Sequence, residues 1–271
     1  MKKILVLLAA LTVVGAARAT MSPILGDEDV GIIATSAPGF ESANGIQILA
    51  VPFAKCMGNG AGTKVMLSDL VSTLNLTAQS NAEAKGSADQ LIVLTTYNDA
   101  PIYYYYWLKL DNGAKVWSKM NMTLLDGTPS EITPVEASAF EVARGEGFWL
   151  KRPVGATTTT LYLKGQVATA NDTVAIEPGL NLMSLGAVTN CALNSAAINW
   201  GTRTGGSTPD KLLVVDPNGS GSWVQYIYNN GKWLEQSGEE FVETTATVAP
   251  GQGFWYVRRG TSDMTFTPVA H

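Results

Sequence analysis

Few side chains in this sequence could act as catalysts. The chain contains a single histidine, His271, which is its last residue, and two cysteines, Cys56 and Cys191. A histidine-activated nucleophile needs its base within hydrogen-bond reach, and a zinc site of the common kind needs several histidine or cysteine ligands. These residues therefore exclude a conventional Ser-His-Asp or Cys-His system and a His-rich zinc site.

Paired carboxylates are the remaining candidates for acid–base chemistry, as in glycoside hydrolysis. The two groups of this kind are Asp27–Asp29 and Glu239–Glu240. Both are typical of solvated loops, and neither has the spacing of a calcium-binding loop. We therefore expect no catalytic residue, no metal site and no cofactor, in a protein that is not an enzyme.

The two cysteines are candidates for a disulfide. Cys56 and Cys191 each follow a similar apolar segment, Gly45–Val51 and Gly179–Leu185. Exported chains with two cysteines usually oxidise them. We expect an intramolecular Cys56–Cys191 bridge, which would contribute roughly 4–5 kcal/mol to stability. Two buried thiols, or bridges between the chains of a polymer, are the alternatives.

Aromatic residues offer another kind of chemistry, because secreted carbohydrate-binding modules stack them on sugar rings. The chain has seven Trp and nine Tyr, four of them in the run Tyr103–Tyr106. In a strand these side chains alternate between two faces, so core packing and cross-strand ladders are the expected role. The alternative is a sugar platform of exposed, coplanar rings. Its candidates are Tyr104, Tyr106, Trp117, Trp223 and Trp233.

A Gly-x-Gly-Phe-Trp motif occurs twice, at Gly145–Trp149 and at Gly251–Trp255. Glycine-rich phosphate sites need a helix after the glycines, whereas the residues that follow here are typical of a strand. We therefore expect a structural role, in which the glycines permit a tight turn or bulge beneath a large ring. The residues concerned are Gly145, Gly147, Phe148 and Trp149 in one copy and Gly251, Gly253, Phe254 and Trp255 in the other.

The composition describes a folded chain with few charges. Of its 271 residues, 46% are hydrophobic and 15% are charged, and the formal net charge is −5. This apolar content is sufficient for a core and argues against wholesale disorder. The negative charge argues against a nucleic-acid binder, which needs a basic surface.

The first nineteen residues predict a cleaved signal peptide. Lys2 and Lys3 precede the apolar run Ile4–Val14, and small residues at Ala17 and Ala19 suit cleavage before Thr20. The run is shorter than the ~20 residues that a membrane-spanning helix needs. We therefore expect an exported protein, secreted or at the extracellular surface of a bacterium, without a membrane span after signal removal.

Three blocks of sequence recur in the same order, which is the mark of an internal repeat. The matches are Gly45–Val51 with Gly179–Leu185, Asp89–Leu94 with Asp210–Val215, and Gly145–Arg152 with Gly251–Arg258. One match could arise by chance, but three in order predict a duplication. We assign residues 20–168 to a first β domain and residues 169–271 to a second.

Local patterns within each copy predict strands. Short runs of β-branched and aromatic residues lie between Gly, Pro, Asn and Asp, and Asn112–Gly113 and Asn230–Gly231 predict hairpin turns. One helix is expected over Thr63–Leu74, with a shorter counterpart over Ala192–Trp200. The fold prediction is an all-β protein of two similar sandwich- or barrel-like domains, packed against each other, with one or two short helices.

The segments Glu177–Ser184, Asp210–Asp216 and Pro250–Arg259 together resemble a recurrent group of exported tandem-repeat β proteins. This group occurs in verrucomicrobial, lentisphaeral and planctomycete-type bacteria, and the likeness covers both copies. The resemblance implies export and a repeated β fold. The group has no established active site, so the resemblance implies none in this chain.

These features together predict a non-enzymatic structural or adhesive protein of the extracellular surface. Self-assembly into a fibre or layer is one form of this role, because duplicated domains offer head-to-tail contacts that need not close. The expected partner is another copy of the chain or a surface glycan. The alternative function is a secreted carbohydrate-binding module that uses exposed Tyr and Trp platforms.

Overall fold

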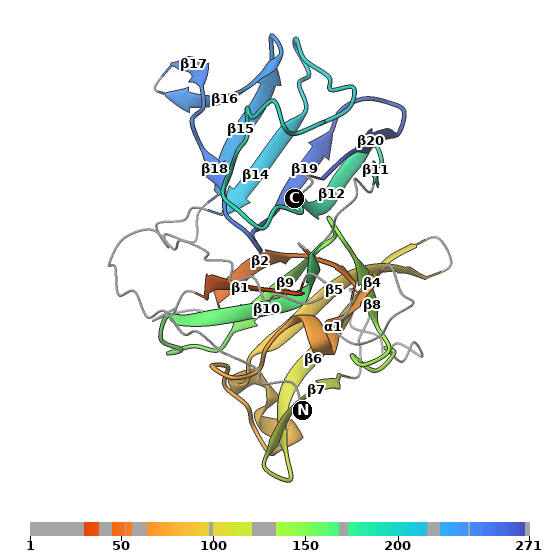
Figure 1. Ribbon diagram of the computed structural model, residues 1–271, viewed down its shortest axis with the longest axis vertical. Helices are drawn as coiled ribbons and strands as arrows, with labels where there is room; N and C mark the ends of the chain where they lie inside the picture. Colours follow the sequence, from red (N-terminus) through yellow and green to blue (C-terminus); the bar gives the residue numbers. More distant parts are fainter. Residues whose placement is uncertain are drawn as a thin grey trace.

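A computed structural model of the chain describes residues 30–37, 45–51, 53–55, 64–97, 100–120, 134–167, 173–215, 223–237 and 239–268 (Figure 1). Within these residues almost all regular structure is strand, so the prediction of an all-β protein with one or two short helices is confirmed. The predicted signal peptide, Asp27–Asp29, Cys56 and His271 lie outside the described residues. We call residues 30–167 the first half and residues 173–268 the second half.

The first half is built on a five-stranded antiparallel sheet. In spatial order its strands are β2 (Gly45–Ala50), β9 (Gly147–Arg152), β5 (Gln90–Tyr97), β6 (Ala100–Asp111) and β7 (Ala114–Lys119). Against it lie the sheet of β1 (Val30–Ala37), β10 (Thr159–Val167) and β3 (Phe53–Lys55) and the pair β4 (Lys64–Met66) and β8 (Glu141–Ala143). The helical segments are α1 (Leu67–Leu70) and the 3₁₀-helix η1 (Ala82–Ser87).

The second half is built on a six-stranded antiparallel sheet. In spatial order its strands are β12 (Gly179–Ser184), β19 (Gly253–Arg258), β14 (Lys211–Val215), β15 (Trp223–Asn229), β16 (Lys232–Ser237) and β17 (Glu240–Glu243). Two pairs accompany it, β11 (Val174–Ile176) with β20 (Met264–Phe266) and β13 (Cys191–Ala192) with β18 (Thr247–Val248).

The two halves repeat one strand order and one register. Leu91 on β5 lies opposite Leu150 and Tyr106, and Leu212 on β14 lies opposite Tyr256 and Tyr226. The order β2-β9-β5-β6-β7 therefore corresponds strand by strand to β12-β19-β14-β15-β16, and β17 has no counterpart among the described residues of the first half. Origin by duplication stays a prediction, which this agreement supports, and the predicted boundary at 168–169 lies outside the described residues.

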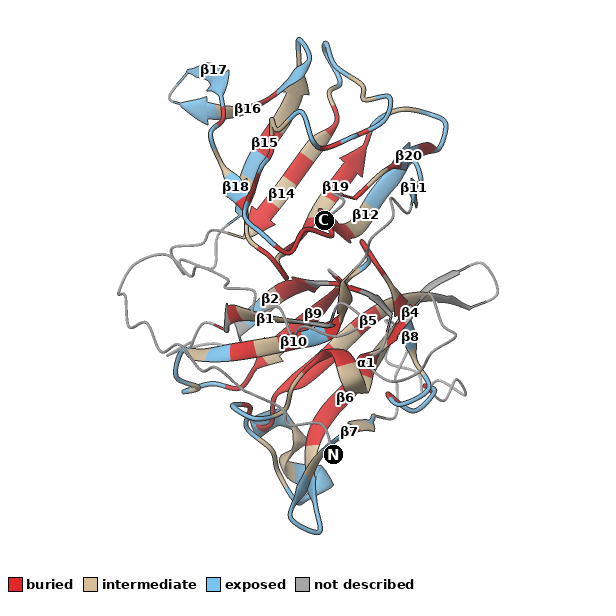
Figure 2. Ribbon diagram, in the orientation of Figure 1, coloured by how far each residue is buried: buried red, intermediate tan, exposed pale blue. Residues whose placement is uncertain are grey.

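Each half buries its own apolar core on one face of its main sheet (Figure 2). The first core includes Phe53, Tyr106, Trp117 and Phe148. The second is centred on aromatic residues, Trp200, Trp233, Phe254 and Tyr256. These rings remove a large apolar area from water and dominate the stability of each half.

The same buried ion pair lies beside each core. Arg152 Nε is 2.7 Å from Asp89 Oδ1, and Arg258 Nη1 is 2.9 Å from Asp210 Oδ2. A threonine N–H, from Thr77 or from Thr204, donates to the same aspartate. Burial raises the pKa of Asp89, although the threonine and arginine bonds act in the opposite direction. Such a group is tolerated in a core because each charge has a partner.

The expected helices are largely wrong. Within Thr63–Leu74 the described residues form strand β4 and then only the four-residue α1, and Ala192–Trp200 consists of the end of β13 followed by turns. The reason is that each segment bonds to a distant part of the chain: Leu67 N–H donates to Phe140 O, and Leu193 N–H donates to Ala246 O. The apolar residues of these segments pack into the two cores, but they do not form one face of a long helix.

Candidate functional site

The two Gly-x-Gly-Phe-Trp motifs lie where the halves meet. Leu49 forms an antiparallel bridge with Gln252, and Glu146 forms one with Met183. In the shared register Leu49 corresponds to Met183 and Glu146 to Gln252. Each bridge is therefore the counterpart of the other, so the halves contact each other through equivalent residues about a local pseudo-two-fold axis.

The glycines of the motif permit this close approach. Gly145 and Gly251 have positive φ angles of 87° and 73°, which favour glycine. A Cβ atom on Gly253 would lie 2.8 Å from Leu49 O, and one on Gly147 would lie 2.8 Å from Leu182 Cγ. The second glycine of each motif is therefore needed because the other half leaves no room for a side chain.

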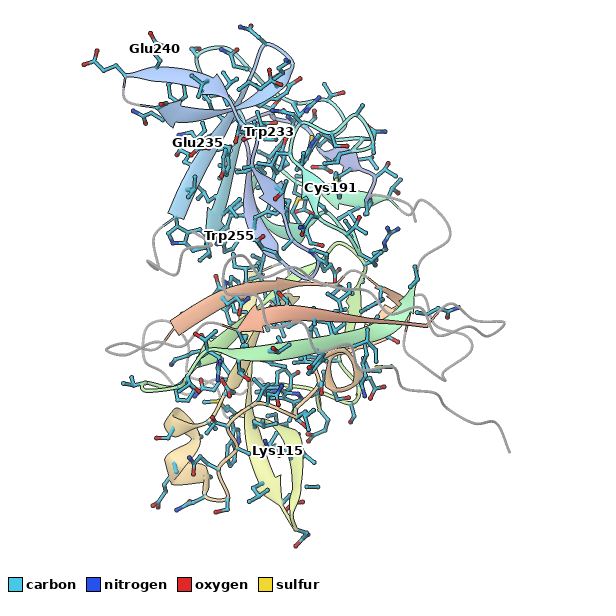
Figure 3. The ribbon with its side chains drawn as sticks, turned by 60° about the vertical axis from the view of Figure 1, so that its left-hand side comes forward. Lys115, Cys191, Trp233, Glu235, Glu240 and Trp255 are labelled. Carbon is cyan, nitrogen blue, oxygen red and sulfur yellow. The ribbon has the colours of Figure 1, made fainter. Side chains whose placement is uncertain are left out.

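The phenylalanine and tryptophan of each motif point to opposite faces of their strand. Phe148 and Phe254 are fully buried in the two cores. Trp149 and Trp255 point to the other face, where their ring centroids are 5.5 Å apart. Figure 3 shows Trp255 at the end of the second half that faces the first. The outward faces of the two main sheets thus pack on each other at this end.

The predicted sugar platform is wrong for three of its five residues. Tyr106, Trp117 and Trp233 are buried, because the two cores take up their rings. Tyr104 is half-buried and packs edge-on against Phe140, with centroids 5.9 Å apart. Only Trp223 is open to solvent, with 47% of its surface exposed. A single exposed ring does not make a platform of two coplanar rings.

Cys191 is buried in the core of the second half and has no disulfide partner among the described residues. Burial raises its pKa, although a hydrogen bond with Ser195 acts in the opposite direction. The pair β13 and β18 of the second half corresponds to the pair β4 and β8 of the first. Cys191 lies opposite Val248 on β18, and Val65 lies opposite Val142 on β8. The structural counterpart of Cys191 is therefore Val65 rather than Cys56. The Cys56–Cys191 bridge stays a prediction, because Cys56 lies outside the described residues.

Of the two predicted carboxylate groups, only Glu239–Glu240 lies in the part of the chain that the structure describes. Glu239 and Glu240 are exposed, and Figure 3 shows Glu240 at the end of the second half away from the first. No group of three or more His, Cys, Asp or Glu side chains comes together among the described residues. Within the same residues no helix has the length and apolar character to cross a membrane.

The outward face of the second sheet carries more apolar than polar side chains, and its polar members include Lys211, Gln225, Lys232, Gln236 and Glu243. We call this surface the open face. Its most exposed members are Leu180, Trp223 and Phe241, at 62%, 47% and 46%. The half-buried members are Leu182, Leu213, Val215, Ile227, Leu234 and Trp255. An antiparallel sheet with one face in water normally alternates apolar and polar residues, so this face has the character of a surface that is to be covered.

A signal for the open face exists in the sequence. The run Leu212–Val215 is apolar without alternation, which is typical of a strand that is buried on both sides. Strand β15 also has apolar residues on both faces: Trp223 and Ile227 point outward, and Val224 and Tyr226 point inward. These patterns identify strands but not the surface that covers their second face.

Comparison of the chain with family models, with curated proteins and with solved structures finds no match. The resemblance to exported tandem-repeat β proteins therefore stays a prediction, as does export itself. What the molecule offers toward a function is the contact between its halves and the open face.

Proposed function

We propose that this protein is a non-enzymatic structural or adhesive component of a bacterial extracellular surface, which assembles with further copies of itself through the open face. The observation that carries the proposal is the apolar character of that face, with Leu180 and Trp223 left exposed. Large exposed apolar side chains that gather on one face often mark a site of protein association.

The contact between the halves supports a second copy as the occupant. There the ends of β2 and β9 already pack against the ends of β12 and β19, the equivalent strands of the other sheet, through Trp149 and Trp255 and through the glycines. The open face continues from this contact by way of Leu182 and Trp255. A surface that binds one sheet of this type within the chain is suited to bind another from a neighbouring chain.

Pairing of sheet edges is the less favoured route. The edge strand β17 is only four residues long and carries Glu240 and Glu243. Short, charged edge strands are a common protection against edge-to-edge pairing. Face-to-face stacking avoids this repulsion. Packing of the open face on a different surface of the next copy does not close and extends into a filament, which is the form of assembly that we propose.

Sedimentation analysis of the chain from Thr20 onward, over a range of concentrations, tests this proposal. We expect association that rises with concentration and that Trp223→Ser weakens by at least tenfold. Leu74→Ser is the matched control, since Leu74 is 70% exposed but lies in the first half, away from the open face. Equal association of both variants would show that the open face is not the contact.

A further inference from the structure

A hollow of about 450 Å³ lies on the second half, where Lys211 and Ile227 on the outward face of the sheet meet the loop 206–209. The N-terminal end of β14, β15 and the edge strand β17 form its floor and one wall, and the loop 206–209 forms its rim. Its volume falls within the roughly 300–1,000 Å³ that is usual for small-molecule sites.

The charge of this hollow is opposite to that of the whole chain. Lys211 and Arg259 line it, and no carboxylate does so among the described residues, although the chain has a net charge of −5. Neither cation takes part in an ion pair within the described residues, and Lys211 Nζ has only Gln225 Oε1 at 3.3 Å. Two cations that share one hollow without a counter-ion favour an anionic group.

The other lining residues suit a ring that carries hydroxyl groups. Phe241 and Ile227 supply an apolar wall, and Phe241 leaves 46% of its surface exposed. Gln225 and Thr208 supply an amide and a hydroxyl beside that wall. An apolar wall with a few convergent polar groups is the usual composition of a site that binds and orients a small ring.

The first half provides an internal comparison, because the same place there is filled. In the shared register Lys211 corresponds to Gln90, Ile227 to Trp107 and Arg259 to Pro153. Gln90 and Trp107 are each only 5% exposed, and Gln90 Nε2 donates to Lys85 O of η1 at 2.9 Å. No cation stands at either of the two corresponding positions.

A difference in loop length opens the place in the second half. Thr77 and Asp89, which bond to each other, are 12 residues apart, and the corresponding Thr204 and Asp210 are 6 apart. The extra residues of the first half include η1. The second half therefore combines a shorter loop, two cations and the additional strand β17 at a single place.

We infer that this hollow binds an acidic sugar residue of a surface polysaccharide, a uronate or a sulfated hexose. Lys211 and Arg259 hold the anionic group, and the sugar ring packs against Phe241. This inference goes beyond the proposed self-assembly and does not depend on it, since it concerns a ligand held in this hollow.

Titration calorimetry tests the inference at a protein concentration below any self-association. The probes are an oligogalacturonate, a sulfated oligosaccharide of similar length, a neutral oligosaccharide and inorganic sulfate. We expect binding of at least one acidic oligosaccharide, weakened by added salt, and affinities at least tenfold lower for the neutral sugar and for sulfate. Which acidic sugar binds better identifies the anionic group.

Three variants assign the binding to this hollow. Lys211→Gln introduces the residue of the first half, and Arg259→Gln and Phe241→Ala remove the second cation and the apolar wall. Each is expected to lower the affinity at least tenfold with an unchanged melting temperature, whereas Lys164→Gln, an exposed lysine on β10, leaves it unchanged. Binding that the three variants do not alter, equal binding of the neutral sugar or of sulfate alone, or no binding at millimolar sugar would overturn the inference.

Discussion

Trp149 and Trp255, the last residues of the two Gly-x-Gly-Phe-Trp motifs, pack on each other across the contact between the halves, with ring centroids 5.5 Å apart and an interplanar angle of 55°. They occupy equivalent positions of the two sheets, so the contact has the form of a two-fold interface within one chain. An aromatic pair of this kind contributes about 0.5–1.5 kcal/mol beyond its buried area.

The second glycine of the motif should be sensitive to the smallest substitution. In Gly253→Ala the new Cβ atom would meet the carbonyl oxygen of Leu49 at 2.8 Å, and backbone cannot move aside as a side chain can. We expect a loss of about 1–3 kcal/mol in the free energy of unfolding, measured by urea denaturation. Gly86→Ala is the control, because a Cβ atom there meets nothing within 4 Å. Equal stability of the two variants would contradict the close contact.

The buried ion pair of the second half should be far more important than an exposed one. Asp210 accepts hydrogen bonds from Arg258 and Tyr256 side chains and from the backbone of Thr204 and Arg259. Asp210→Asn leaves Arg258 without a counter-charge, so we expect a loss of about 3–5 kcal/mol. Asp111→Asn, which breaks the exposed pair with Lys109, should cost less than about 1 kcal/mol. Urea denaturation of both variants measures the two losses. Losses of similar size would contradict the greater importance of the buried pair.

Stability should fall at alkaline pH because of buried phenols. Burial raises the pKa of Tyr106 and of Tyr256 well above the ordinary value of about 10. The folded state keeps these protons where the unfolded state loses them, so the stability is complete below about pH 10 and declines as the pH rises further. Thermal unfolding between pH 8 and pH 12 measures this decline.

Tyr106→Phe isolates one of these phenols. Its hydroxyl donates to Val135 O at 2.8 Å, so the variant should lose about 1 kcal/mol at pH 8. The difference from the parent should shrink above pH 10, because the variant has one fewer proton to lose on unfolding. Parallel curves over the whole range would show that the burial of Tyr106 does not influence the titration.

The cysteines permit a direct comparison of two expectations. Val65 stands in the first half where Cys191 stands in the second, so under reducing conditions Cys191→Val should change the stability by less than about 1 kcal/mol. Melting temperatures without reductant then test the bridge. A parent protein that is stabilised by oxidation, with the gain absent from Cys191→Val, would show that Cys56 and Cys191 join; equal values would show that Cys191 remains a thiol.

Local sequence was sufficient for the strands and the hairpins. The Asn-Gly turns have the positive φ angles that their residue types favour, 48° at Asn112 and Asn230 and 84° at Gly113 and Gly231. Local sequence was not sufficient to place Cys191, because the position of Cys191 depends on pairing with β18, a strand more than fifty residues away along the chain. It also could not show which face of a strand is covered, as the buried Tyr106 and the exposed Trp223 illustrate.

Electron microscopy of the chain from Thr20 onward, purified without reductant, together with extracellular material of the source cells, tests the central claim most directly. The account predicts regular filaments or layers in both samples, with Trp223→Ser failing to form them and Leu74→Ser forming them normally. Dispersed single molecules at high protein concentration, with no such assembly around the cells, would contradict it.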